Sequence, residues 1–453
     1  MNRRRNILFL TNRLPYPPDK GDKIRTCHQL EHLAASHDVC CACFVDSAED
    51  LALLPELNRR CRSAAAVRWQ PLPAVIRGAQ GWLRGGSITT AAYRDRTMFD
   101  RLARWTARIR FDAVVAFSST MAPYALAVPA ARRVLDMCDV DSEKWSDYAR
   151  TGRPGWSALC RSEARRLRAL EQSCLERFDA TILITPRERR LLDPTETMGR
   201  LHVIPNGVDL PRGPFTPASK RGPVVGFLGS MDYRPNVEGI DWFVRRVWPG
   251  VLRELPEARL WIVGRNPTRR VRGLARTRGV TVTGTVRDAR AYLARCRVVV
   301  APLHVARGMQ NKVLEAMASR RPVVATSAVA GGLRVRNRHN ILVADAPDRF
   351  RMRVVDLCRF ETLCDEIAEA GYRHVAAHYC WPEVLQRYER LILGPSRPAA
   401  RKLPVSAIGR PSAVVRDRIR GLTYAPPGGS EAAQGRRAGA VRPVQTPPAP
   451  TAP

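Results

Sequence analysis

Short apolar runs alternate with helical patterns along most of the chain. Ile24, Cys27, Leu30 and Leu33 recur at three-residue spacing, which predicts an amphipathic helix. Because strand-like runs that alternate with such helices are typical of parallel sheets covered on both faces, we expect an α/β protein. The expected strands are residues 7–10, 39–45, 113–117, 134–136 and 181–184 in the first half, and residues 224–228, 260–263, 280–283, 298–301, 323–325 and 341–343 in the second.

An irregular stretch rich in proline and glycine separates the two series of strands. We therefore expect two doubly wound Rossmann-like domains that face one another across a cleft, since such folds bind ligands at the carboxyl ends of their strands. A helical stretch over residues 349–393, with a break near Trp381 and Pro382, closes the ordered part. The expected boundaries are residues 1–200 and 223–378 for the domains, 201–222 for a linker, 379–393 for a closing helix and 394–453 for a disordered tail.

The formal net charge of +33 changes this picture only slightly. Six lysines stand against 69 arginines, so a general bias toward arginine explains much of the charge. The segment from Gly394 holds ten basic and two acidic residues and accounts for +8 of the total. A basic surface nevertheless favours anionic partners such as phosphates or the lipids of the inner leaflet.

The cysteines and the apolar runs suggest a compartment. Most of the twelve cysteines, such as Cys41 and Cys296, lie in strand-like runs, which predicts buried, reduced thiols. The N-terminal apolar run spans only residues 7–10, too short for the core of a signal peptide. No run reaches the roughly 18 apolar residues that a membrane span needs. We expect a cytoplasmic protein that is soluble or peripheral on the inner face of the membrane.

Residues 307–318, RGMQNKVLEAMA, carry the strongest chemical signal. They follow a predicted strand, so a loop leads into a helix whose free N–H groups can receive a diphosphate. Lys312 adds a positive charge in the first turn. Glu315 lies on the same helix face, where its carboxylate can accept hydrogen bonds from ribose hydroxyls. A surface helix with a Lys–Glu pair is the structural alternative.

Three further runs accompany this segment, namely residues 12–25 (NRLPYPPDKGDKIR), 204–209 (IPNGVD) and 229–236 (GSMDYRPN). Together the four runs resemble glycosyltransferase family 4, which has the GT-B fold, over about residues 5–393. Residues 139–145 (DVDSEKW) and the RGMQNK sequence most resemble the sugar transferases associated with exosortase/PEP-CTERM exopolysaccharide loci. The resemblance implies transfer of a sugar from a nucleotide-sugar to a glycan or a polyprenyl-diphosphate-linked acceptor, with retention of configuration and with no metal or other cofactor.

The resemblance also implies that the N-terminal domain takes the acceptor and the C-terminal domain the donor. Arg234 and Lys312 are then the expected phosphate clamp, which would stabilise the departing nucleoside diphosphate. Residues 284–287 (GTVR) are expected to contact the base through backbone atoms, with an ordinary strand end as the alternative. The implied donor-binding residues are Gly229, Arg234, Gly284, Val286, Arg307, Gly308, Gln310, Asn311, Lys312 and Glu315.

Two positions depart from the family pattern. Many members have two glutamates eight residues apart; Glu315 matches the second, but Arg307 stands at the first. An arginine cannot accept hydrogen bonds from sugar hydroxyls, although it can bind phosphate or an acidic sugar. Ser230 stands where a basic residue often follows the glycine matched by Gly229.

In the N-terminal domain, Gly21, Asp22 and Arg25 are the implied acceptor-binding residues. Gly21 permits close approach of a ligand to the backbone, and a helix-capping role is the alternative for Asp22. Asp139 and Asp141 follow a predicted strand and are expected to orient or deprotonate the acceptor hydroxyl, with Arg234 and Lys312 as the other catalytic residues. A purely structural role is the alternative for both aspartates.

Three rival functions remain. Asp139 and Asp141 form the Asp-x-Asp pair with which the unrelated GT-A transferases hold a divalent metal. A GT-B sugar-nucleotide epimerase would use cleft histidines, for which His28, His32 and His304 are candidates. A nucleic-acid-binding protein would work through the arginine-rich tail, but no nucleic-acid motif supports this, and we expect no nucleic-acid partner.

A stretch of the first domain interleaves basic and aromatic residues. Such a surface can lie against anionic lipid headgroups, where a polyprenyl-linked acceptor is found. Ordinary amphipathic packing is the alternative. The residues are Trp82, Arg84, Tyr93, Arg94, Arg96, Phe99, Arg101, Arg104 and Trp105.

Overall fold

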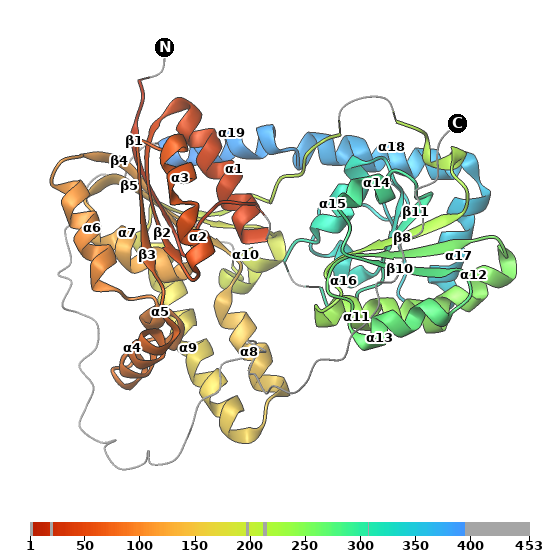
Figure 1. Ribbon diagram of the computed structural model, residues 1–453, viewed down its shortest axis with the longest axis horizontal. Coiled ribbons are helices and arrows are strands. Elements are labelled where there is room, and N and C mark those ends of the chain that lie inside the picture. The colour runs from red at the N-terminus through yellow and green to blue at the C-terminus, as the bar shows by residue number, and fades with distance from the viewer. Residues whose placement is uncertain (1–2, 19–20, 196–198, 212–214, 307, 395–453) are drawn as a thin grey trace, which may run out of the picture. The chain divides into compact units, whose positions relative to one another are not determined.

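The computed structural model describes residues 3–18, 21–195, 199–211, 215–306 and 308–394. Two sheets, each with helices on both faces, make up this part of the chain (Figure 1). We call the first sheet and its helices the N-lobe and the second sheet and its helices the C-lobe. The predicted α/β class with two doubly wound parallel sheets is confirmed. The expected tail, apart from Gly394, lies outside the described residues, as does Arg307.

The N-lobe sheet has seven parallel strands in the order β3-β2-β1-β4-β5-β6-β7. The strands are β1 (Asn6–Thr11), β2 (Asp38–Val45), β3 (Ser63–Arg68), β4 (Phe111–Phe117), β5 (Ala130–Cys138), β6 (Ala180–Leu183) and β7 (Leu201–Val203). The helices are α1 (Gly21–Ser36), α2 (Ala48–Ala52), α3 (Leu54–Arg60), α4 (Pro71–Leu83), α5 (Ile88–Ala92), α6 (Arg96–Thr106), α7 (Ala122–Ala127), α8 (Asp141–Thr151), α9 (Pro154–Arg177) and α10 (Pro186–Leu192).

The C-lobe sheet has six parallel strands in the order β10-β9-β8-β11-β12-β13. They are β8 (Val224–Leu228), β9 (Arg259–Val263), β10 (Val280–Gly284), β11 (Val298–Ala301), β12 (Val323–Ala325) and β13 (Leu342–Val343). The helices are α11 (Arg234–Trp242), α12 (Trp248–Glu254), α13 (Arg269–Gly273), α14 (Ala289–Leu293), α15 (Asn311–Ala318), α16 (Ser327–Ala330), α17 (Pro347–Arg359) and α18 (Glu361–His378).

Side chains of β1 show why the N-lobe needs helices on both faces of its sheet. Leu8 and Leu10 belong to one core cluster, whereas Ile7 and Phe9 belong to another. Successive side chains of a strand point to opposite faces, so an apolar strand buries itself only when both faces are covered. The last helix, α19 (Trp381–Leu393), contributes Tyr388 to the cluster of Ile7 and Phe9, although it follows the C-lobe in the chain.

Some elements differ from the prediction. The sequence pattern did not predict β3, whose run SAAAVR is weakly apolar and only partly buried. It also missed β7, three residues at the start of the expected linker that pair with β6. The expected helical stretch 349–393 is three helices, because the chain breaks at Phe360 as well as before Trp381.

Arg25 of α1 joins three segments of the chain. Its guanidinium donates to the Asp136 carboxylate at 2.9 Å, to the Pro205 carbonyl at 2.9 Å and to Asn206 Oδ1 at 3.0 Å. Asp136 at the end of β5 also accepts from Gln29 at 2.8 Å. Arg25 is only 1% exposed. The pair therefore fixes residues 204–206 against the carboxyl end of the N-lobe sheet.

The IPNGVD run continues this junction into α19. A Cβ on Gly207 would lie 2.2 Å from the Trp381 ring, so only glycine lets the backbone pass there. The next N–H, that of Val208, donates to the Tyr379 carbonyl at 2.7 Å. This run thus secures the point where the chain crosses from one lobe to the other and back.

Replacing Arg25 by methionine should lower the free energy of unfolding by about 3–5 kcal/mol, because a buried carboxylate loses its counter-charge. Urea unfolding of the full chain measures this change. Arg96→Ala is the control, since the Arg96 side chain is 94% exposed and its removal should cost less than about 0.5 kcal/mol. Equal effects of the two substitutions would contradict the structural role of Arg25.

Candidate active site

Lys312 is the second residue of α15, directly after the loop that leaves β11. Its ammonium group donates a hydrogen bond to Asn236 Oδ1 on α11. It also lies 4.8 Å from the centre of the Phe227 ring on β8. A Cβ on Gly229 would come within 3.2 Å of this ammonium and 2.6 Å of Asn236 Nδ2. The glycine therefore leaves the room that the lysine occupies.

The charges on α15 are poorly solvated. Desolvation lowers the pKa of Lys312 to about 7, and the nearby Glu315 carboxylate opposes this shift only in part. Desolvation also raises the pKa of Glu315, against the attraction of Arg290 and Lys312. A lysine in this condition gains a proton, and full charge, when an anion binds next to it.

A second charged group borders Glu315. Arg290 on α14 forms an ion pair with Asp209 at 2.7 Å, and both influence the pKa of Glu315. Sequence reasoning missed Arg290. Gly284, at the end of β10, has a φ of +70°, and Val286 packs against the C-lobe core. Through Arg290, the segment from β10 to α14 thus reaches the neighbourhood of Glu315.

The remaining donor candidates differ in their surroundings. Arg234 begins α11, but its side chain is 80% exposed and pairs with Glu238 at 2.7 Å. Gln310 is the residue before α15. Within the described residues, the buried Oδ1 atom of Asn311 has no hydrogen-bond partner, so it is a free acceptor at the start of the helix. Asn236, the last residue of the GSMDYRPN run, gives no sign in the sequence of its contact with Lys312.

Asp139 and Asp141 lie on a tightly held turn after β5. Cys138 adopts a φ of +66°, and the N–H groups of Val140 and Ser142 donate to buried carboxylates of Glu188 at 2.8 Å and Glu171 at 2.9 Å. The backbone of the turn is therefore fixed by side chains from α10 and α9.

The two aspartates are not equivalent. Asp141 begins α8 and accepts a hydrogen bond from Ser119 at 2.8 Å, whereas the Asp139 side chain keeps contact with solvent although protein atoms surround most of it. Desolvation by the surrounding protein raises the pKa of both, and repulsion between them adds to the shift at Asp139. A Cβ on Gly308, in the loop before α15, would lie 3.1 Å from Asp139 Oδ1. Among the described residues no three His, Cys, Asp or Glu side chains gather as metal ligands do.

Comparison with known families covers both lobes. Residues 21–207 match the family described as "Glycosyl transferase 4-like domain", and residues 222–359 match "Glycosyl transferases group 1". The chain is a glycosyltransferase of the family 4 type. Comparison of the glycosyltransferase with curated protein sequences finds no significant match.

Solved structures share the GT-B fold of the glycosyltransferase. HepE from Anabaena, solved with UDP and glucose, has a TM-score of 0.60 and 15% identity, with 86% of this chain and 100% of that chain covered. Sucrose-phosphate synthase from Thermosynechococcus elongatus has a TM-score of 0.58 and 17% identity, with 86% and 98% covered. A glycosyltransferase from Rickettsia africae has a TM-score of 0.57 and 12% identity, with 87% and 100% covered.

The residues of the glycosyltransferase expected to bind the acceptor differ in their exposure to solvent. Asp22, in the first turn of α1, pairs with Arg13 at 3.1 Å, and Gly21 before it is exposed. The structure gives Arg25 a different role from the predicted contact with the acceptor. Because its guanidinium is buried and already bonded to Asp136 and to residues 204–206, it has no surface for an acceptor.

Two of the histidines considered for an epimerase, His28 and His32, lie one helical turn apart on α1 and both contact α19. His28 stacks on Trp381 with ring centres 4.1 Å apart, and His32 contacts Glu389 at 2.8 Å. His304 lies edge-on to Trp242 at 4.6 Å. His304 thus packs against a C-lobe helix, whereas the two histidines of α1 pack against α19.

The basic and aromatic residues expected to form one surface point in different directions, some toward the core and some toward solvent. The aromatic members Tyr93, Phe99 and Trp105 pack against an N-lobe core cluster, and the arginines that separate them are exposed. Instead, α4 presents apolar side chains to solvent, namely Leu72, Val75, Ile76 and Leu83. The opposite face of α4 carries the small residue Gly78, which lets the helix pack closely against Ile88 of α5. None of the described helices is long and apolar enough to cross a membrane.

We expect the wild-type protein to gain stability relative to Lys312→Met as the pH rises from about 7 toward 10. The folded lysine releases its proton near pH 7, whereas the unfolded one holds it up to its ordinary pKa, so the unfolded state binds more protons over this range. The slope should be at most about 1.4 kcal/mol per pH unit. Urea unfolding at several pH values measures it.

Lys220→Met is the matched control, because Lys220 is 63% exposed and should show no such slope below pH 9. A stability difference between wild type and Lys312→Met that does not change with pH would contradict the desolvated state of Lys312.

Proposed function

We propose that the glycosyltransferase moves a sugar from a nucleotide-sugar to a glycan or polyprenyl-diphosphate-linked acceptor in exopolysaccharide biosynthesis, with retention of configuration. The observation that carries the proposal is the desolvated Lys312 at the first turn of α15, held by Asn236 and Phe227. A cation and free helix N–H groups at one place form a binding site for a diphosphate.

The proposed donor site extends along α15. Lys312 binds the diphosphate, and Arg234 joins it by leaving Glu238. The free acceptor Asn311 Oδ1 can take a hydrogen bond from a sugar hydroxyl. Glu315 receives the ribose hydroxyls, and the backbone from Gly284 to Val286 receives the base. That HepE was solved with UDP-glucose, at 15% identity to this chain, supports a nucleotide-sugar as the class of donor.

The chemical step needs negative charge to be stabilised on the leaving diphosphate. A preorganised cation in a poorly solvated site contributes this at little reorganisation cost. Asp139 is the better placed of the two aspartates to orient the acceptor hydroxyl, because Asp141 is already bonded to Ser119. Its raised pKa also makes it a better base than an ordinary aspartate. Retention and the exopolysaccharide role rest on the resemblance of the sequence motifs, and no metal takes part in the proposed reaction.

The proposed acceptor places the enzyme at the inner face of the cytoplasmic membrane. The exposed side chains of α4, among them Leu72 and Ile76, and the neighbouring Arg84 fit an interface of acyl chains and anionic headgroups. A lipid-linked acceptor would present its diphosphate at such a surface.

Thermal unfolding of the full chain with UDP, GDP, ADP and several nucleotide-sugars tests the donor site. A nucleotide at 100 times its Kd should raise the Tm by about 5 °C, with or without EDTA. Lys312→Ala and Glu315→Ala should each weaken that binding at least tenfold, because each removes a direct contact with the donor.

Lys220→Ala, which removes an exposed lysine of the same lobe, should bind like the wild type. No shift with any nucleotide would overturn the proposal. A shift that EDTA abolishes would favour a metal at Asp139 and Asp141 instead.

A further inference from the structure

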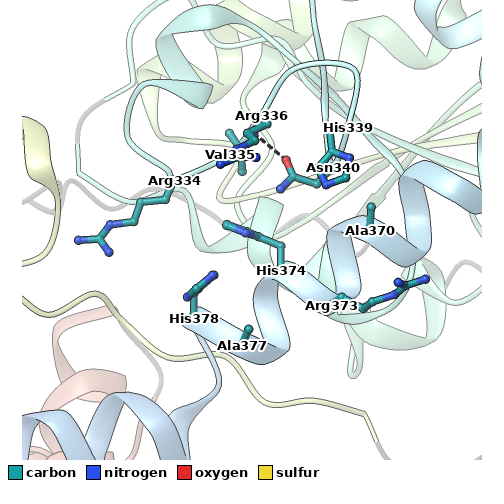
Figure 2. A pocket seen from close by; sticks show the side chains of 10 residues that line it. All are labelled: Arg334, Val335, Arg336, His339, Asn340, Ala370, Arg373, His374, Ala377 and His378. Carbon is teal, nitrogen blue, oxygen red and sulfur yellow. Dashed lines mark hydrogen bonds between the residues drawn. The ribbon is translucent and has the colours of Figure 1, made fainter.

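A pocket of about 600 Å³ lies in the C-lobe between α18 and the segment that connects α16 to β13. Arginines and histidines dominate its lining, and none of the described residues that line it carries a carboxylate (Figure 2). None of its residues belongs to the proposed donor or acceptor sites. The lining consists of Arg334, Val335, Arg336, His339, Asn340, Ala370, Arg373, His374, Ala377 and His378.

The connecting segment is fixed to the body of the lobe from two sides. The buried Asn340 accepts a hydrogen bond from the Arg336 N–H at 2.8 Å, and its carbonyl lies 3.3 Å from where a Cβ on Gly371 of α18 would stand. The Arg334 N–H donates to the Tyr379 hydroxyl at 3.0 Å. The backbone is therefore held, while the side chain of Arg334 extends away from it (Figure 2).

The positive charge in this pocket has little compensation. In the part of the chain that the structure describes, the guanidinium groups of Arg334 and Arg336 have no hydrogen bond or ion pair. Arg373 pairs with Glu369 at 3.2 Å, but Glu369 also lies 3.6 Å from Arg320. Like charges gathered in this way repel one another, and an anion would remove that cost.

His374 lies at the centre of the cluster. Its ring centre is 4.9 Å from that of His378 and 5.7 Å from that of Tyr379. Its Nε2 atom is enclosed and has no hydrogen-bond partner among the described residues. Burial, followed by repulsion from His378, His339, Arg334 and Arg336, lowers the pKa of His374 to about 4. The imidazole is thus neutral in the empty pocket and would take up a proton beside an anion.

We propose that this pocket binds a diphosphate group, as a second anion site separate from the donor site. Arginine forks bind phosphate oxygens in pairs, and the enclosed His374 Nε2 supplies a further donor once it is protonated. The volume accommodates a diphosphate together with the first atoms of whatever it is attached to. The group can come from a soluble diphosphate or from a lipid diphosphate.

The site is also joined to the donor loop. Gly332, two residues before Arg334, packs so closely on the loop before α15 that a Cβ there would lie 2.7 Å from the Gly308 carbonyl. Arg334 and His378 line a second, small cavity together with Gly332. An anion that draws Arg334 inward would therefore act on the segment that supports Gly308.

Titration calorimetry with pyrophosphate tests the site in the full chain. Because pyrophosphate also fits the donor site, the Lys312→Ala variant is the background protein. We expect one binding event in it, and the added Arg334→Ala and Arg336→Ala substitutions should weaken that event at least tenfold. Arg338→Ala is the matched control, since Arg338 is exposed on the same segment but does not line the pocket, and it should change the affinity less than twofold.

NMR titration of the His374 ring supplies a second measurement, the pKa of this ring. Pyrophosphate would not change that pKa if the pocket had only a structural role. Saturating pyrophosphate should raise the pKa by at least one unit from the value in the free protein. Farnesyl diphosphate distinguishes the two sources: binding at least tenfold tighter than pyrophosphate identifies a lipid diphosphate, and equal binding identifies a soluble one. Absence of pyrophosphate binding, or full binding by the double arginine variant, would overturn the proposal. Either result is independent of whether the donor site binds nucleotides.

Discussion

The proposed donor site depends on how the C-lobe encloses the ammonium group of Lys312. Lys312 reaches its place only because Gly229 has no side chain, because Asn236 turns an oxygen toward it and because Phe227 offers the face of its ring. These three residues come from β8 and the turn and helix that follow, whereas the lysine comes from α15 after β11. Neighbouring parallel strands end at the same edge of a sheet, so residues more than 70 positions apart meet there.

The motifs divide into those that build the site and those that hold the chain together. The GSMDYRPN and RGMQNK runs meet at Lys312. The IPNGVD run instead uses Asn206 and Gly207 to fix the crossing of the chain against Arg25 and Trp381, and only its last residue, Asp209, reaches toward the proposed donor site through Arg290. Similarity of a motif to a family thus does not tell which of its residues contact a ligand.

The fold could be predicted from the sequence because uninterrupted apolar runs such as those of β1, β2 and β11 identify buried parallel strands. The edge strands β3 and β7 were missed, since a weakly apolar or very short strand leaves little pattern. The start of a helix at Lys312 and Glu315 could also be predicted, since a loop after an apolar run leads into it. Three features depend on packing between distant segments, which a single sequence does not reveal. They are the burial of Arg25, the contact of Asn236 with Lys312 and the exposed apolar face of α4.

The central claim is that Lys312 is a desolvated lysine whose charge is completed by a bound diphosphate. NMR of the chain with isotope-labelled lysine side chains, in which only six signals arise, measures the pKa of this group directly. We expect a pKa near 7 in the free protein and a value above about 9 with a saturating nucleoside diphosphate. A pKa at the ordinary value of lysine in the free protein, or one that the nucleotide leaves unchanged, would contradict this claim.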